Sequence, residues 1–296
     1  MAEYTFKEFQ KDFPDDAACL KSVMVSQFGG TRLYCPGCGV EAEFHAMTKR
    51  RAYACQECGH HIYPCANTIF HKSRTPLTNW FFAMYLMTST RHGVAAKELE
   101  RQIGCTYKTA WRMAHELRKL MAAADTSGKG PLNGHVEIDE TFIGGRSAGR
   151  GSQFGVDNKT VVFGMMERDG RVIAGPVPDR LKATLEPIIK KNVERRAMIS
   201  TDEHGAYSGL AGIGYNHGTV NHHQEIWVDG ITHTNGIEGH WGQLKRSIKG
   251  THIHVSSKHL WKYVSEFSYR RNNRGSHYTM FRKLVYSLSL PRLADA

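Results

Sequence analysis

The feature that most restricts the fold of this chain is a set of two cysteine pairs. Cys35 and Cys38 form one CxxC pair, Cys55 and Cys58 form another, and sixteen residues separate the pairs. Two tight turns that each supply two thiolates, joined by a strand-rich hairpin, are typical of a zinc ribbon with a tetrahedral site. Because cysteine fills all four positions, no coordination site is left open. We therefore predict one structural Zn²⁺ ion within residues 29–71.

Other potential zinc ligands lie close to these pairs. Cys65, His60, His61 and His71 are rival ligands, although packing or surface roles are commoner for such side chains. The chain has seven cysteines, which is an odd number for a secreted disulfide framework, whereas CxxC pairs in a cytosolic protein indicate metal binding. We expect zinc rather than disulfides.

Composition points to a soluble protein that binds nucleic acid. A chain of 296 residues is long enough for about two domains. The net charge of +11 and the pI near 9.3 favour a polyanionic partner, because Lys and Arg release counterions when they neutralise phosphates. The longest apolar run, 80–87, is too short to span a bilayer, and we expect no membrane partner.

Residues 72–125 have the pattern of a helix-turn-helix DNA-binding domain, after a helical lead-in at 1–28. Thr75 is the expected N-cap of the first helical segment, with Pro76 at its first position, Gly104 ends the second, and Thr106 caps the third. A short helix, a Gly-containing turn and a basic second helix match this motif, while a plain three-helix bundle is the alternative. In the motif, three side chains would face DNA: Lys108, Arg112 and Arg118.

A β-branched stretch, 135–145, carries acids in its middle. Side chains alternate along a strand, so Glu137, Asp139 and Thr141 share one face. A carboxylate in an apolar strand needs a cationic partner, and a divalent metal ion is one such partner. An edge strand whose acids face water is the alternative.

Further sheet elements follow this strand. A Gly- and Arg-rich loop, 144–151, either cradles phosphate or is only a connector. Two antiparallel strands meet at the Asp169 turn, a helix spans 184–193, and the next strand ends at Asp202. An acid at a strand end is a common site residue. A short strand is predicted at 219–222.

The helix predicted over 235–249 has an apolar stripe, which includes Trp241, and a polar stripe beside it. The polar stripe carries Glu238, Lys245 and Lys249, which suits a metal followed by a phosphate track. Asn235 and Glu238 also match a capping box, in which Asn235 accepts a hydrogen bond from the helix N-terminus.

The C-terminal part of the chain is strongly basic. Between Lys245 and Lys283 there are ten Lys or Arg residues and one acid, Glu266. Such one-sided charge is typical of contact with a nucleic-acid backbone. We expect residues 276–296 to form a basic C-terminal tail.

Several motifs occur together in this chain besides the four-cysteine ribbon. They are Val136-Glu-Ile-Asp139-Glu-Thr, Ser200-Thr-Asp202-Glu, His233-Thr-Asn235-Gly-Ile-Glu238-Gly-His-Trp, Leu244-Lys245-Arg, Gly250 and Lys258-His-Leu. In this combination the chain resembles bacterial insertion-sequence DDE transposases of the zinc-ribbon, ISXO-like group. The resemblance covers most of the chain, from the lead-in helix to Asn273.

The resemblance implies an RNase-H-like catalytic domain over 131–275, a mixed sheet with helices on both faces. Asp139, Asp202 and Glu238 would be its acidic triad, with Lys245 as the accompanying basic residue. The third acid is Glu in some members of the group and Asn in others, so Asn235 is an alternative to Glu238. Three such carboxylates suit two Mg²⁺ (or Mn²⁺) ions that catalyse an in-line displacement.

The function expected from this resemblance is DNA transposition. The ribbon and the helix-turn-helix would bind the terminal inverted repeats, and the triad would hydrolyse DNA phosphodiesters at the element ends and transfer the strands into target DNA. We expect a bacterial, cytoplasmic, nucleoid-associated protein that forms a homo-oligomer on DNA ends. A non-catalytic DNA-binding regulator and a structure-selective nuclease are the alternatives.

Overall fold

The computed structural model describes residues 4–144, 159–221, 224, 228–290 and 293. The chain divides into two compact units, Met1–Ala124 with Asn273–Ala296, and Asp125–Asn272. The bounds of the second unit are close to those predicted for the catalytic domain, 131–275. The predicted loop at 144–151 falls outside the described residues after Gly144.

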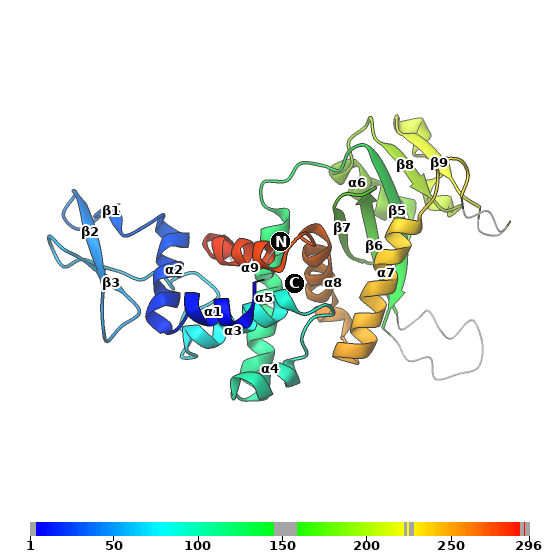
Figure 1. The fold of residues 1–296 in the computed structure, drawn as a ribbon. Coiled ribbons are helices and arrows are strands. Elements are labelled where there is room, and N and C mark those ends of the chain that lie inside the picture. The colour runs from blue at the N-terminus through cyan, green and yellow to red at the C-terminus, as the bar shows by residue number, and fades with distance from the viewer. Residues whose placement is uncertain (1–3, 145–158, 222–223, 225–227, 291–292, 294–296) are drawn as a thin grey trace. The chain divides into compact units, whose positions relative to one another are not determined.

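The zinc ribbon in the first unit is a four-stranded antiparallel sheet in chain order (Figure 1). Its strands are β1 (Arg32–Tyr34), β2 (Glu41–Ala46), β3 (Tyr53–Cys55) and β4 (His61–Ile62). Cys35 directly follows β1, and Cys55 is the last residue of β3. The hairpins therefore bring the two CxxC turns to the same end of the ribbon.

Helices make up most of the rest of the first unit (Figure 1). They are α1 (Phe6–Asp12), α2 (Asp16–Phe28), α3 (Leu77–Ser89), α4 (Ala96–Ile103), α5 (Tyr107–Thr126) and α9 (His277–Tyr286). The lead-in thus forms helices, as predicted. Gly104 adopts the left-handed conformation at the end of α4, and the Thr106 hydroxyl accepts a hydrogen bond from the Thr109 amide at the start of α5.

The prediction of a basic tail over residues 276–296 is wrong. Helix α9 and the following 3₁₀ turn, η5 (Ser287–Ser289), pack against α2, and α9 also packs against α3. Phe281 is fully buried, and its ring lies 5.6 Å from that of Phe13. The reason is an apolar face that recurs every three or four residues beside the charged Arg282 and Lys283. Its buried members are Met280, Phe281, Leu284, Val285 and Leu288.

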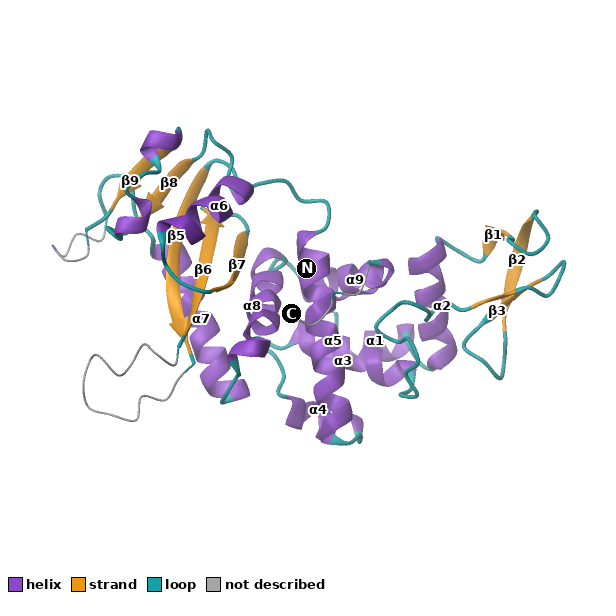
Figure 2. Ribbon diagram, turned by 180° about the vertical axis from the view of Figure 1, so that it is seen from behind, coloured by secondary structure: helices purple, strands orange, loops and turns teal. Residues whose placement is uncertain are grey.

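The second unit is built on a five-stranded mixed sheet in the order β7-β6-β5-β8-β9 (Figure 2). Its strands are β5 (His135–Ile143), β6 (Thr160–Glu167), β7 (Val172–Val177), β8 (Met198–Thr201) and β9 (Asn216–Thr219). Strands β5, β6 and β7 pair antiparallel, whereas β8 pairs parallel with both β5 and β9. The short strand predicted at 219–222 is found slightly earlier in the chain, as β9, which pairs with β8.

Helices cover both faces of this sheet. On one face, Leu185 and Ile189 of α6 (Lys182–Asn192) join a core with Val136 and Ile138 of β5. On the other, α7 (Asn235–Ser247) and α8 (Ser257–Asn272) pack on β6. A π-helical turn, η4 (Ile248–His252), follows α7. The predicted alternation of β5 therefore holds, because its even-numbered apolar residues face α6 and its acids at 137 and 139 face α7.

Candidate zinc centre and candidate acidic site

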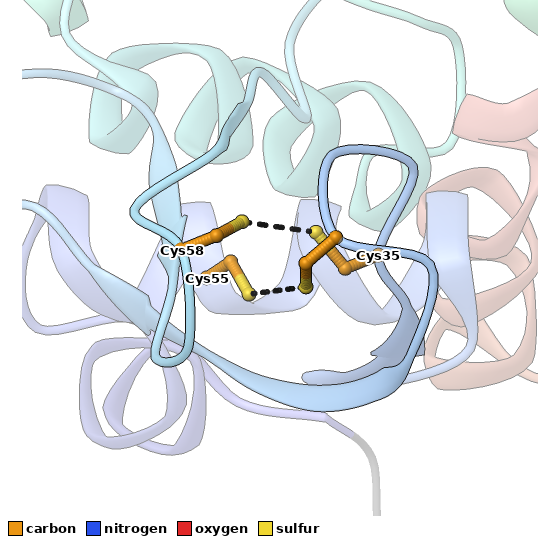
Figure 3. A group of neighbouring side chains, drawn as sticks. Cys35, Cys55 and Cys58 are labelled. Atoms are coloured by element: carbon orange, nitrogen blue, oxygen red, sulfur yellow. Dashed lines mark hydrogen bonds between the residues drawn. The ribbon is translucent and has the colours of Figure 1, made fainter.

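The four ribbon cysteines converge on one point (Figure 3). Their sulfur atoms all lie within 4.8 Å of one another, with Cys35 Sγ 3.6 Å from Cys58 Sγ and Cys38 Sγ 3.9 Å from Cys55 Sγ. A tetrahedral zinc ion with Zn–S bonds of about 2.3 Å requires sulfur–sulfur edges of about 3.8 Å. The geometry therefore fits a structural Zn²⁺, as the spacing predicts.

A glycine follows each CxxC pair, and backbone amides of the first turn favour the Cys35 thiolate. Gly39 and Gly59, one residue after each second cysteine, have φ angles of 74° and 72°, a region in which residues with a Cβ are strained. Burial tends to raise the pKa of the Cys35 thiol, but hydrogen bonds from the backbone amides of Cys38 and Gly37 outweigh it and lower this pKa to about 6. A cysteine that loses its proton readily is a better zinc ligand.

The rival ligands do not join this group. Within the described part of the chain, the four cysteines are the only set of three or more His, Cys, Asp or Glu side chains close enough to share a metal ion. Cys65 is buried, and burial raises the pKa of its thiol to about 11. A buried thiol of this kind behaves as a small apolar side chain.

Glu137 is a buried anchor rather than an exposed acid. Its Oε2 accepts hydrogen bonds from the backbone amides of Gly236 at 2.8 Å and Ile237 at 3.0 Å, at the start of α7. Its Oε1 lies 3.3 Å from Arg168 Nε and 3.3 Å from His233 Nδ1. A carboxylate at a helix N-terminus compensates the unpaired amides and the positive end of the helix dipole.

Asp139 lies two residues farther along β5, on the same face. Its Oδ2 accepts a hydrogen bond from Trp241 Nε1 of α7 at 2.9 Å. Gly164 of β6 pairs directly with Asp139, and a Cβ on Gly164 would lie 2.5 Å from the Trp241 ring. The missing side chain on β6 therefore makes room for the indole beside the acid.

Asp202 follows β8 directly. Glu137 pairs with Ser200 in the parallel register of β5 and β8, so two residues farther along each strand Asp202 comes beside Asp139. Burial, aided by the charges of Glu140 and Asp202, raises the pKa of Asp139 to about 7. Burial, followed by the charge of Glu140, also raises the pKa of Asp202. The structure therefore brings the two strand acids together, with too little positive charge nearby to keep their pKa values low.

Glu238 is half-buried on α7, three residues before Trp241. Its Oε1 accepts a hydrogen bond from the Thr234 hydroxyl at 2.6 Å. Thr234, not Asn235, is the N-cap, so the capping box of Asn235 and Glu238 is absent. Among the described residues, the three acids do not lie close enough to one another to form a metal-sharing group like that of the four cysteines.

The sequence pattern missed a polar cluster beside the strand acids. The side chain of Glu140 is 3% exposed, accepts a hydrogen bond from the Tyr207 hydroxyl at 2.5 Å and pairs with Arg180 at 3.1 Å. These partners come from regions 40 and 67 residues away. The signal in the sequence was a second acid directly after Asp139, but nothing local identifies its partners.

The candidate DNA-contacting residues differ in exposure. Lys108, Arg112, Lys245 and Lys249 are exposed, as the helical patterns predict. Arg118 is only 1% exposed, so the expectation that it faces DNA is wrong for this structure. From Met113 to Leu120 every residue of α5 is buried, so this part of the helix has no solvated face.

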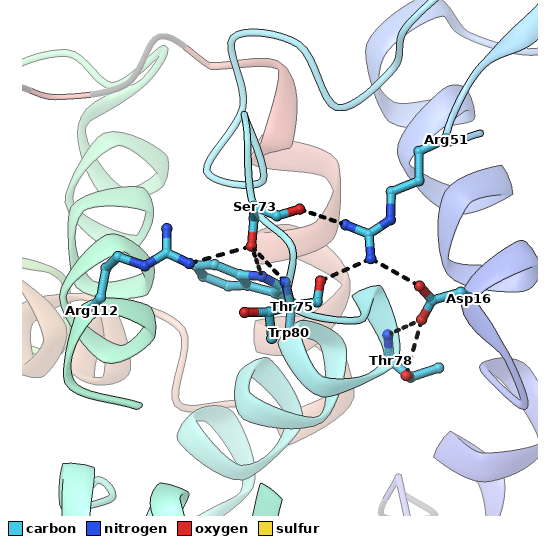
Figure 4. A network of polar contacts seen from close by, with 7 residues as sticks. All are labelled: Asp16, Arg51, Ser73, Thr75, Thr78, Trp80 and Arg112. Carbon is cyan, nitrogen blue, oxygen red and sulfur yellow. Dashed lines mark hydrogen bonds and ion pairs between the residues drawn. The ribbon is translucent and has the colours of Figure 1, made fainter. Parts of the chain in front are cut away.

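Arg112 belongs to a polar network of the first unit (Figure 4). Its guanidinium donates to Ser73 Oγ at 3.3 Å and lies 5.4 Å from the centre of the Trp80 ring. In the same network Arg51 donates to Asp16 and to the carbonyl oxygens of Ser73 and Thr75. Arg51 thereby ties the ribbon to α2 and to the segment before α3.

The N-terminal cap of α3 differs from the prediction, because it comes from Asp16. Its Oδ1 accepts hydrogen bonds from the backbone amide and the hydroxyl of Thr78 (Figure 4). The N-cap position is Pro76, which makes no side-chain cap, and Thr75 does not cap the helix. A carboxylate on α2 performs the role that the sequence assigned to Thr75.

Fold and sites together define a zinc-ribbon protein with a second, acid-bearing mixed α/β domain. Residues 14–61 match the family model of the transposase zinc-ribbon domain, and residues 131–272 match that of the ISXO2-like transposase domain. The two matches together cover more than half of the chain. The chain therefore belongs to the ISXO2-like transposases that carry a zinc ribbon.

Two relatives agree with this assignment. The chain is 26% identical over 259 residues to an uncharacterized protein in transposable element ISH50 of Halobacterium salinarum, which covers 81% of this chain and 85% of the relative. It is 29% identical over 97 residues to an uncharacterized transposase-like protein of Haemophilus influenzae, which covers 33% of this chain and 77% of the relative. No described helix is long and apolar enough to cross a membrane.

Proposed function

We propose that this chain is a Mg²⁺-dependent DDE transposase that cleaves the ends of an insertion sequence and joins them to target DNA. The observation that carries the proposal is the placement of Asp139 beside Asp202. The helix that bears Glu238 is attached to Asp139 by the hydrogen bond from Trp241. Family membership adds to this geometry.

The topology of the second unit supports an RNase-H-like domain. Three sequential antiparallel strands are followed by a crossover helix, and the fourth strand then pairs parallel with the first. This arrangement places the first acid in the middle of the central strand and the second at the end of its parallel neighbour. Each acid lies two residues beyond Glu137 and Ser200, which pair in the parallel register, so the two side chains are well placed to share ligands.

The charges of this site suit divalent cations. Burial and the charge of Glu140 raise the pKa of both Asp139 and Asp202, and a bound cation would relieve this cost. We propose that Asp139, Asp202 and Glu238 hold two Mg²⁺ (or Mn²⁺) ions, with Asn235 as the alternative third ligand. Such a pair of ions activates the attacking oxygen and stabilises the leaving oxygen of an in-line displacement at phosphorus.

The chain's basic residues would hold the DNA. Lys245 on α7 and Lys249 on the following turn η4 are exposed beyond Glu238, where their ammonium groups would contact backbone phosphates beside the scissile bond. Exposed Lys108 and Arg112 on α5 support recognition of the terminal repeats by α4 and α5 as a helix-turn-helix. Two ends must be brought together for transposition, so we propose that the chain forms a homo-oligomer on DNA.

The test begins with the DNA on either side of the gene, where inverted repeats are expected. Purified protein, labelled repeat DNA and a target plasmid are incubated with Mg²⁺, and cleaved and joined products are measured separately, with Asp139→Asn as the inactive control. Binding without cleavage would instead identify a regulator, and cleavage without joining would identify a nuclease.

A further inference from the structure

Helix α7 is fixed to the sheet by three hydrogen bonds to two acids of one strand. Glu137 accepts from the Gly236 and Ile237 amides, and Asp139 accepts from the indole of Trp241. The two acids are two residues apart on β5, and their partners lie about one helical turn apart on α7. Glu238 lies on the turn between these two attachments.

A glycine makes room at each attachment. A Cβ on Gly236 would lie 2.4 Å from Met166 Cε and 2.8 Å from Glu137 Oε2, so the amide reaches the acid because no side chain intervenes. A Cβ on Gly164 would lie 2.5 Å from Trp241 Cη2. Neither glycine has a positive φ, so space rather than backbone conformation explains both.

We propose that Trp241 is a positioning residue for the metal site: its N–H holds Oδ2 of Asp139 and thereby orients the other carboxylate oxygen toward a divalent cation. This inference rests on the proposed function. A hydrogen bond from outside the ligand set commonly fixes the rotamer of a ligating side chain. The same bond fixes the position of α7, and so the place from which Glu238 reaches the ions.

Simple core packing is the competing explanation. Trp241 is 3% exposed within an apolar cluster, and a buried indole N–H needs some acceptor. The two explanations differ in what the N–H does. If packing is the whole role, a ring of similar size without the N–H serves equally well for metal binding, whereas a positioning role requires the donor.

Matched variants separate these explanations. Trp241→Phe keeps an aromatic ring and removes the donor, and Gly164→Ala displaces the indole while leaving its N–H intact. Trp261→Phe is the control for the first, because the Trp261 N–H has no hydrogen-bond partner in the described residues. Gly175→Ala is the control for the second, because a Cβ at this position on β7 meets nothing within 4 Å.

The main measurement is direct Mn²⁺ binding to the full-length, zinc-loaded protein, by calorimetry and by electron paramagnetic resonance of free Mn²⁺. We expect Trp241→Phe and Gly164→Ala to weaken Mn²⁺ binding by about tenfold or more, the usual effect of losing a hydrogen bond to a metal ligand. Both controls should bind Mn²⁺ as the wild type does. In DNA cleavage, the Mg²⁺ concentration for half-maximal rate should rise, and excess Mg²⁺ should restore much of the rate.

An Mn²⁺ affinity for Trp241→Phe within twofold of wild type overturns the inference. Loss of cooperative melting in both test variants, with folded controls, also overturns it, because the role would then be structural. Mn²⁺ binding needs no DNA, so these results stand apart from the proposed function. That function fails if wild-type protein binds Mn²⁺ yet cleaves no repeat DNA.

Discussion

Glu137 Oε2 lies 2.8 Å from the backbone nitrogen of Gly236, 99 residues later in the chain, so a buried acid of the central strand caps the start of α7. Helix caps usually come from the residue just before the helix, but here Thr234 makes no side-chain cap. The first turn of α7 therefore depends on the sheet for its hydrogen bonds.

Replacing Glu137 should thus destabilise the second unit. In Glu137→Gln the amide group faces two backbone donors and Arg168 with at most one acceptor oxygen, so we expect a loss of about 1–3 kcal/mol, the cost of unsatisfied buried polar groups. Urea unfolding followed by tryptophan fluorescence measures it. The control is Glu194→Gln, since Glu194 is exposed; equal stability of the two variants would contradict the anchoring role.

The zinc site should depend on each ribbon cysteine. Cys35→Ser removes one of four thiolates, and we expect it to lose bound zinc and unfold the ribbon, since structural zinc sites supply folding energy to small domains. Elemental analysis of purified protein should give one zinc per wild-type chain. Cys65→Ser is the control and should retain that zinc, because its thiol lies outside the group. A wild-type protein without zinc contradicts the prediction.

Local pattern predicted most elements because the apolar spacing of this chain is regular. The CxxC spacing predicted the ribbon, and alternation predicted that Glu137 and Asp139 share a face of β5. The sequence pattern did not predict which charged residues are buried. Lys262 is 2% exposed and Arg270 pairs with buried Glu266 at 2.8 Å, so the basic stretch from 245 to 283 is less available to DNA than its composition indicates. A charge in sequence does not reveal the partner that allows its burial.

The candidate site was predictable in part for the same reason. The strand acids stand out as acids within apolar runs, whereas the contact of Trp241 with Asp139 depends on how a helix docks on a strand 102 residues away. The pattern placed Trp241 only in the apolar stripe. Gly164 gave no signal at all, because its role depends on the β5–β6 register.

Because the pKa of Asp139 is raised, the stability of the folded protein should decrease as the pH rises. This pKa is 3.8 in an unfolded chain and about 7 when folded, so the folded protein holds this proton more tightly. Stability conferred by the protonated acid is fully present below pH about 4 and is lost as pH rises toward 7. In EDTA at pH 8, after zinc content has been verified, Asp139→Asn should melt about 2–4 °C above wild type, the shift from about 1 kcal/mol.

This difference should vanish at low pH, where wild-type Asp139 is protonated. Melting scans from pH 4 to pH 8 test it, with Asp179→Asn as the control, because hydrogen bonds to Asp179 lower its pKa. A constant difference across the pH range would mean that packing, not charge, separates the two proteins.

DNA binding should distinguish exposed from buried cations on α5. Lys108→Ala should weaken repeat binding and reduce the slope of log affinity against log salt by about 0.9, the value for one lost phosphate contact. Arg112→Ala should do the same and also lower stability, because it loses Ser73 and the Trp80 ring. Arg118→Ala should instead reduce stability at unchanged salt slope. Binding titrations at several salt concentrations decide this, and a full slope loss for Arg118→Ala would contradict the structure.

The third acid is tested by Glu238→Gln. Gln retains an oxygen that accepts from the Thr234 hydroxyl, so the contact at 2.6 Å survives while the negative charge is lost. We expect this variant to melt within about 1 °C of wild type, since the change is isosteric and keeps the contact with Thr234, and to bind repeat DNA normally. Cleavage and joining with Mg²⁺ should fall by at least about a hundredfold, because a neutral amide binds Mg²⁺ far more weakly than a carboxylate.

Thr234→Val is the companion variant, which removes the hydroxyl and keeps the acid. If Glu238→Gln cleaves at a near wild-type rate, the third ligand is to be sought at Asn235, at Asp229, or at Glu225, which lies outside the described residues. Asn235 is the first to replace, because it is exposed at the start of the same helix, one turn from Glu238.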